Sequence, residues 1–76
     1  IQAYLNEMLE SGTPAEFVQA LNDVARARGM NDVAKGANMG RTTLYKTLQS
    51  EKPRFESLAK VLDSLGYQLQ VVSKHA

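Results

Sequence analysis

The sequence predicts an all-α domain of five helices followed by one short β-strand. Apolar residues recur at helical spacing in five segments, and glycine, proline and asparagine separate these segments. After Gly66 the apolar residues alternate with polar ones instead, which is the pattern of a strand. A chain of 76 residues has room for one hydrophobic core and not for a second. We therefore expect residues 1–76 to form a single domain.

The composition excludes several classes of protein. Without cysteine, the chain has no disulfide framework, no thiolate metal site and no cysteine nucleophile. No long apolar run is present, and no basic stretch precedes a hydrophobic one, so neither a membrane span nor a signal peptide is expected. The sequence thus suggests a soluble, cytoplasmic protein. Because it opens on Ile1 rather than methionine, we expect further residues upstream.

Charge is distributed unevenly along the chain, although the net charge is only +1. Residues 1–23 carry four acids and no base, whereas residues 24–54 carry seven bases and two acids. Such asymmetry indicates a polyanion-binding face beside a region with a different partner, or simply a solvated face. The seven bases are Arg26, Arg28, Lys35, Arg41, Lys46, Lys52 and Arg54.

The first two helices are predicted over residues 2–11 and 14–28. The first is amphipathic and stops at Gly12. Thr13 precedes the second as its N-cap, Pro14 takes the first helical position, and Glu16 completes a capping box. Gly29 follows as a residue able to adopt positive φ.

The remaining helices are shorter. Asn31 is the expected N-cap of a helix over residues 32–37, and Asn38 to Gly40 form a tight turn. A fourth helix is predicted over residues 41–49 and a fifth over about 54–65. The residues expected to face inward from these two helices are Leu44, Thr47, Leu48, Phe55, Leu58, Ala59, Val61, Leu62 and Leu65.

The last predicted element is a strand over about residues 67–72. Tyr67, Leu69 and Val71 alternate with two glutamines. A lone strand has no ladder partner, so we expect the same strand of a second copy to pair with it, which makes these three residues the interface of a homodimer. The alternative is a tail that packs Tyr67 and Leu69 onto its own core.

A helix-turn-helix is predicted from about Met30 to Gln49. Ala34 is small enough for two helices to approach each other, and Asn38 and Gly40 supply the turn. Val33 and Leu44 form the apolar pair between the helices. In this motif the second helix lays a polar face in the major groove of DNA.

The outward face of the fourth helix contains no carboxylate. Arg41 is placed to read guanine, whereas Tyr45 and Lys46 are expected to position the DNA backbone. Tyr45 has a plain alternative role, which is to cover Leu48 at the rim of the core. The full set of expected DNA-binding residues is Arg41, Thr42, Thr43, Tyr45, Lys46, Gln49, Lys52 and Arg54.

Nothing in the sequence indicates an enzyme. The only histidine is His75, near the C-terminal end, and Glu7 and Glu10 have the spacing of a solvated helix face. No three acids or histidines converge on one predicted face, so we expect no metal and no cofactor.

A family resemblance covers nearly the whole chain. The segments that carry it are Tyr4–Leu5, Pro14–Phe17, Asp23–Met30, Leu44–Leu48, Pro53–Phe55, Lys60–Leu62 and Leu65–Gly66. The chain resembles the addiction-module antidotes, which are HigA-like antitoxins with a lambda-repressor-like (Cro or Xre) helix-turn-helix. It departs from that pattern at Asn38, where the turn usually has glycine, and at Gly36, which costs a helix about 1 kcal/mol against alanine.

The resemblance implies an antitoxin that neutralises a RelE/HigB-like toxin and represses their shared operon by binding operator DNA. It assigns recognition of DNA to Arg41, Thr42, Thr43, Tyr45 and Lys46. Such toxins are basic, so the acidic first helix is the expected docking surface, with Tyr4, Glu7 and Met8 as its contacts. Two alternatives remain: a stand-alone, phage-type Cro-like repressor without a toxin, and a helical adaptor that binds only protein.

Overall fold

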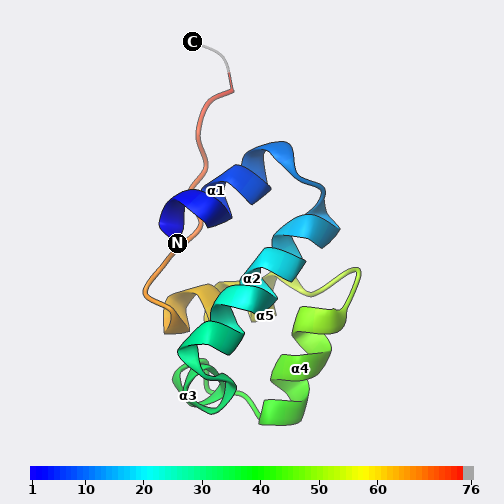
Figure 1. Cartoon of the computed structure of the whole chain (residues 1–76), viewed down its shortest axis with the longest axis vertical. Coiled ribbons are helices and arrows are strands. Elements are labelled where there is room, and N and C mark those ends of the chain that lie inside the picture. Colours follow the sequence, from blue (N-terminus) through cyan, green and yellow to red (C-terminus); the bar gives the residue numbers. More distant parts are fainter. Residues whose placement is uncertain (75–76) are drawn as a thin grey trace.

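The computed structural model describes residues 1–74, and His75 lies outside them. Helices are the only regular elements within this range, and they follow one another around a common core (Figure 1). Their order agrees with the five helices predicted from the sequence. They are α1 (Gln2–Ser11), α2 (Pro14–Arg28), α3 (Met30–Gly36), α4 (Arg41–Gln49) and α5 (Phe55–Ser64).

The corner between α1 and α2 has the predicted capping box. The hydroxyl of Thr13 accepts a hydrogen bond from the Glu16 backbone N–H at 3.2 Å, and the Glu16 carboxylate accepts one from the Thr13 N–H at 3.1 Å. These bonds satisfy two backbone donors that a helix start otherwise leaves open. Both helices have the bounds that the sequence predicts.

The start of α3 differs from the prediction. Gly29 ends α2 with φ at 113° and is also the residue from which α3 begins, so the helix starts at Met30. Asn31 was expected as the N-cap and instead lies inside the helix, where no side chain caps the start. Because Gly29 tolerates this backbone conformation, a single residue turns the chain and no separate cap is needed.

A four-residue turn joins α3 to α4. Asn38 adopts the left-handed conformation, with φ at 53°, whereas Gly40 does not. The N–H of Met39 donates to the Ala34 carbonyl at 3.0 Å and holds the turn against the end of α3. Asparagine is one of the few side chains that tolerate this conformation, so it performs the role that the turn requires.

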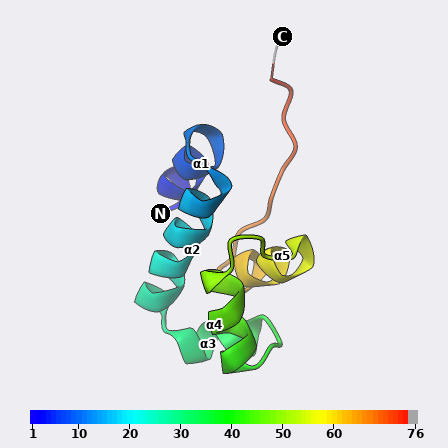
Figure 2. The same ribbon diagram turned by 90° about the vertical axis from the view of Figure 1, so that its right-hand side faces the viewer.

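The core is built around α2, which packs against α1, α3 and α4, while α5 packs against α3. Figure 2 shows α2 beside α4, with α5 on the side of α4 that faces away from α2. All five helices contribute to one apolar cluster. Its largest fully buried side chains are Leu21, Val33, Leu44 and Val61.

Gly36 lets α3 and α5 approach each other closely. A Cβ atom added at this position would lie 2.5 Å from the hydroxyl oxygen of Ser64. That hydroxyl donates a hydrogen bond to the Val33 carbonyl at 3.0 Å, which ties the end of α5 to α3. The glycine that the sequence marks as a cost to the helix therefore makes room for this contact.

The fifth helix is correctly placed, but one of its expected core residues is wrong. Phe55 is the first residue of α5 and its side chain is 69% exposed. Val61, Leu62 and Leu65 are buried as predicted, and Leu58 and Ala59 are half-buried. The apolar spacing cannot say where the core ends along a helix, and Phe55 lies beyond that end.

The predicted C-terminal strand is absent from the described residues. Residues 67–72 contain no strand, because no described segment runs alongside them to form a ladder. Tyr67 and Leu69 instead pack, half-buried, against the chain's own core, which is the alternative that the sequence left open. Val71 has no such contact and is 98% exposed. In Figure 1 this segment passes α1 and continues away from the helices.

Within residues 1–74, none of the helices combines the length and the apolar character needed to cross a lipid bilayer.

Candidate nucleic-acid interface

The buried side of α4 fixes which of its residues face outward. Leu44, Thr47 and Leu48 are buried, and the Thr47 hydroxyl donates to the Thr43 carbonyl at 2.9 Å. With one side of the helix held in the core, the opposite side is open to solvent. The exposed residues are Arg41, Thr42, Thr43, Lys46 and Gln49, and no acid lies within α4.

Tyr45 lies half-buried at the edge of this exposed face. Its ring packs against the core cluster, in keeping with the covering role considered from the sequence. Its hydroxyl oxygen accepts a hydrogen bond from the Arg41 guanidinium at 3.2 Å. The same guanidinium lies 5.4 Å from the centre of the ring, within the range of a cation–π contact. The structure thus joins two of the expected DNA-binding residues.

A second arginine reaches the same ring from a different helix. The guanidinium carbon of Arg26, on α2, is also 5.4 Å from the centre of the Tyr45 ring. The Nε–H of Arg26 donates to the Asn22 side-chain oxygen at 3.3 Å, which orients the guanidinium. Sequence reasoning missed this contact, because the packing of α2 against α4 cannot be read from residue spacing.

The two arginines change the acidity of the phenol. The hydrogen bond from Arg41, followed by the positive charges of Arg41 and Arg26, lowers the pKa of Tyr45 below its usual value of 10.0, although partial burial opposes the shift. The hydroxyl oxygen accepts from Arg41, so its own proton remains available to a further acceptor. A phenol of lowered pKa is a stronger hydrogen-bond donor, which suits it to an anionic acceptor.

The two basic residues after α4 lie in different surroundings. Lys52 is exposed, its backbone N–H donates to the Ser50 hydroxyl at 3.1 Å, and it lines an apolar groove of about 620 Å³ beside Phe55. Arg54 is exposed at the N-cap position of α5. No ion pair or ring contact joins either residue to the side chains of α4 within the described part of the chain.

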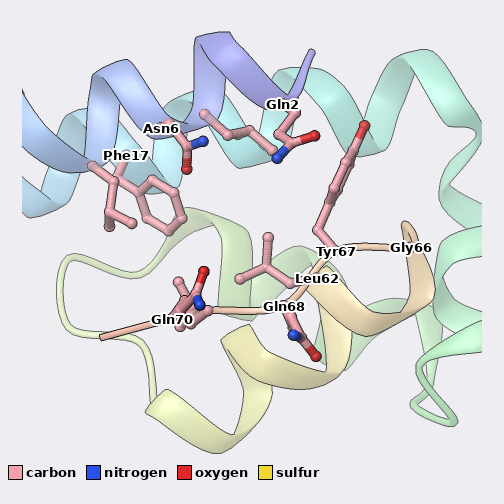
Figure 3. A pocket seen from close by; sticks show the side chains of 11 residues that line it. Gln2, Asn6, Phe17, Leu62, Gly66, Tyr67, Gln68 and Gln70 are labelled. Carbon is pink, nitrogen blue, oxygen red and sulfur yellow. The ribbon is translucent and has the colours of Figure 1, made fainter. Parts of the chain in front are cut away.

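A hollow of about 310 Å³ lies between α1 and the C-terminal segment. Figure 3 shows Gln2 and Asn6 on the side of α1 that faces this segment, and the Tyr67 side chain pointing toward α1. Phe17 and Leu62 also line the hollow. Its lining consists of amides and apolar groups, and among residues 1–74 no three acids, histidines or cysteines gather as metal ligands.

The residues expected to contact a toxin lie on α1. Tyr4 is 40% exposed and Glu7 is exposed, whereas Met8 is half-buried and packs against the core. A partner on this helix would thus reach Tyr4 and Glu7 directly and Met8 only at its edge.

Comparison with known proteins identifies the family. Residues 1–73 match the family described as "probable addiction module antidote protein". The chain belongs to this antidote family. A relative from Haemophilus influenzae strain Rd, described as an uncharacterized protein, is 42% identical over 72 residues, which cover 93% of this chain and 74% of the relative. No solved structure matches the chain.

Membership in the antidote family gives the chain its general role. An antidote of an addiction module is the antitoxin of a toxin–antitoxin pair, so the protein has a toxin of some kind as its partner. The family match agrees with the antitoxin role that the resemblance implies.

Proposed function

We propose that this antitoxin is HigA-like and represses its own operon by binding operator DNA through a lambda-repressor-like helix-turn-helix made of α3, the turn and α4. The observation that supports the proposal best is the outward face of α4, which is exposed and contains no acid. An acid on this face would repel the phosphates that flank the major groove. The buried side of α4 is held in the core, so the exposed side is rigid enough for recognition.

Each residue of the face has a role that its chemistry allows. Arg41, at the start of α4, reads a guanine through two parallel hydrogen bonds, and Gln49 can pair in the same way with adenine. Thr42 and Thr43 contact phosphates or a thymine methyl group. Lys46 contacts the backbone as a point charge. Lys52 and Arg54 add phosphate contacts from the loop after α4.

We further propose that two copies bind together as a homodimer, so that two α4 helices read two half-sites about one helical turn apart. The two copies need not pair through a strand, since residues 67–72 contain none. Of the three residues expected at the dimer interface, Val71 is the most exposed, while Tyr67 and Leu69 lie half-buried against the core of their own chain. Light scattering of the purified protein should give the mass of two chains of 8.4 kDa, and the mass of one chain would contradict the dimer.

A gel-shift titration with the DNA upstream of the gene, repeated across salt concentrations, tests the DNA role. Arg41→Ala should lose preference for the operator over unrelated DNA, because one bidentate base contact is worth about 1–3 kcal/mol of discrimination. Lys46→Ala should bind every sequence more weakly and lower the slope of log K against log salt by about 0.9 for each copy bound, or about 1.8 for the proposed dimer, since each copy loses one phosphate contact. If both variants bind as the parent does, α4 is not the recognition helix.

For the toxin, we propose a basic RelE/HigB-like protein that docks on the acidic face of α1 at Tyr4, Glu7 and Met8. Residues 1–23 contain no base, so this end of the molecule attracts a cationic partner.

The small protein encoded by the neighbouring gene serves as the probe. Glu7→Lys should weaken its binding about tenfold, because the change replaces attraction with repulsion. Glu56→Lys, the same change of charge at an exposed site on α5, is the matched control and should have little effect. Equal losses from the two variants would show that only net charge matters and would exclude α1 as the docking surface.

A further inference from the structure

Arg26, which contacts Tyr45, lies outside the predicted helix-turn-helix. Arg26 is in the last turn of α2, which precedes the predicted helix-turn-helix. Its guanidinium lies near the aromatic ring of α4 and is held by the Asn22 side chain. The bond to Asn22 uses the Nε–H, so the two terminal amino groups have no hydrogen-bond partner within the described residues. The four N–H donors of these amino groups thus remain without a partner among the described residues, on a guanidinium oriented beside α4.

Among the described residues, no acid forms an ion pair with the positively charged Arg26 or Arg41. Within residues 1–74 the ion pair that forms joins Lys60 to Glu56, on α5. Two guanidinium groups therefore approach one ring, each at 5.4 Å, without an anion between them. Both groups are cations, so an anion bound beside the ring is attracted to each of them.

From this arrangement we propose that Arg26 and Tyr45 together bind one backbone phosphate of duplex DNA at the edge of the recognition helix. The inference rests on the proposed DNA-binding function and extends the interface to a helix outside the helix-turn-helix. The terminal amino groups of Arg26 donate to the phosphate oxygens, and the Tyr45 hydroxyl donates its remaining proton to the same group.

The dimensions of the major groove favour a phosphate over a base as the group that Arg26 contacts. An α-helix with its side chains is about 10–12 Å wide, and the major groove is about 12 Å wide, so α4 fills the groove. An element packed alongside α4 then lies over the sugar–phosphate backbone. Arg26 is on such an element, since α2 packs against α4. A guanidinium already oriented by Asn22 and Tyr45 also loses less side-chain entropy on binding.

The experiment is a salt titration of operator and unrelated DNA, measured by fluorescence anisotropy. Arg26→Gln should weaken binding to both DNAs about five- to tenfold near physiological salt and lower the salt slope by about 0.9 for each copy bound, or about 1.8 for the proposed dimer, which is the signature of one lost phosphate contact in each copy. Arg26→Lys keeps the charge and should retain most of the salt slope. Circular dichroism of each variant checks that the fold is kept, which is expected because Arg26 is exposed.

Arg28→Gln is the matched control, because Arg28 carries the same charge in the same turn of α2, is exposed, and has no ring contact with Tyr45. It should change the affinity and the salt slope much less than Arg26→Gln. A nuclear magnetic resonance titration adds a readout that needs no DNA: Arg26→Gln should raise the pKa of Tyr45, since one positive charge near the phenol is removed.

The outcomes separate the two proposals. A parent that binds no DNA overturns the proposed function and this inference with it. A parent that binds DNA, with Arg26→Gln and Arg28→Gln indistinguishable, overturns only the phosphate contact. An Arg26→Gln variant that loses operator preference while binding unrelated DNA normally also overturns it, because the residue would then read bases.

Discussion

At the scale of single residues, the contact between Gly36 and Ser64 decides how closely α3 and α5 pack. Alanine is usually favoured over glycine inside a helix by about 1 kcal/mol. At this position its Cβ would lie 2.5 Å from the Ser64 hydroxyl oxygen and 3.3 Å from the Ser64 Cβ. The hydroxyl can move only by giving up its hydrogen bond to Val33. The tertiary contact therefore outweighs the intrinsic preference.

We expect Gly36→Ala to lower the free energy of unfolding by about 1–2 kcal/mol, because overpacking costs more than helix propensity returns. In a Ser64→Ala background the same change should cost less, since the closest atom is gone. Urea denaturation of the four proteins of this double-mutant cycle gives the coupling. A Gly36→Ala protein more stable than its parent would contradict the packing described here.

Single residues also show which contacts could be predicted from the sequence and which could not. The Thr13 capping box was predictable because both of its partners lie within one turn of chain. The use of Gly36, the exposure of Phe55 and the approach of Arg26 to Tyr45 were not, because each depends on a helix that is distant in sequence. Hydrogen bonds within one turn of chain can thus be predicted from the sequence, whereas these features, which depend on distant helices, cannot.

At the scale of elements, the segment after α5 shows how one pattern can serve two structures. Alternation of apolar and polar residues fits a paired strand, and it equally fits an extended segment that lays every second side chain on the core. The structure has the second arrangement, with Tyr67 and Leu69 half-buried and the Tyr67 N–H donating to the Leu62 carbonyl at 2.9 Å. The helices were predictable because their apolar stripes match a single period, and this segment was not because its partner is not local.

Two truncations test what this segment contributes to stability. A chain ending after Gly66 should lose about 2 kcal/mol, because it loses the burial of Tyr67 and Leu69. Among the described residues, a chain ending after Gln70 loses exposed side chains only, Val71 among them, and it should match the parent within about 0.5 kcal/mol. Urea midpoints measure both effects. Equal stability of the two shortened chains would mean that Tyr67 and Leu69 do not contribute through their core contacts.

At the scale of the whole molecule, the charge asymmetry along the sequence becomes an asymmetry between elements. The acids of residues 1–23 lie on α1 and on α2 ahead of its last turn, whereas the bases begin in that last turn and continue beyond α2. Helix α2 contacts both α1 and α4. It carries acids ahead of its last turn and two arginines within that turn, so one helix holds both signs of charge. Under the proposed function, this asymmetry would draw a basic toxin and an acidic nucleic acid to different parts of the protein.

Tyr45, beside its two arginines, can also report on binding through its own fluorescence. The chain has no tryptophan, so its emission comes from three tyrosines alone. Tyr4 is on α1, Tyr45 is on α4 and Tyr67 is on the C-terminal segment, one for each surface proposed to meet a partner. With two of them changed to phenylalanine, the fluorescence of the third reports on a single surface without any attached dye.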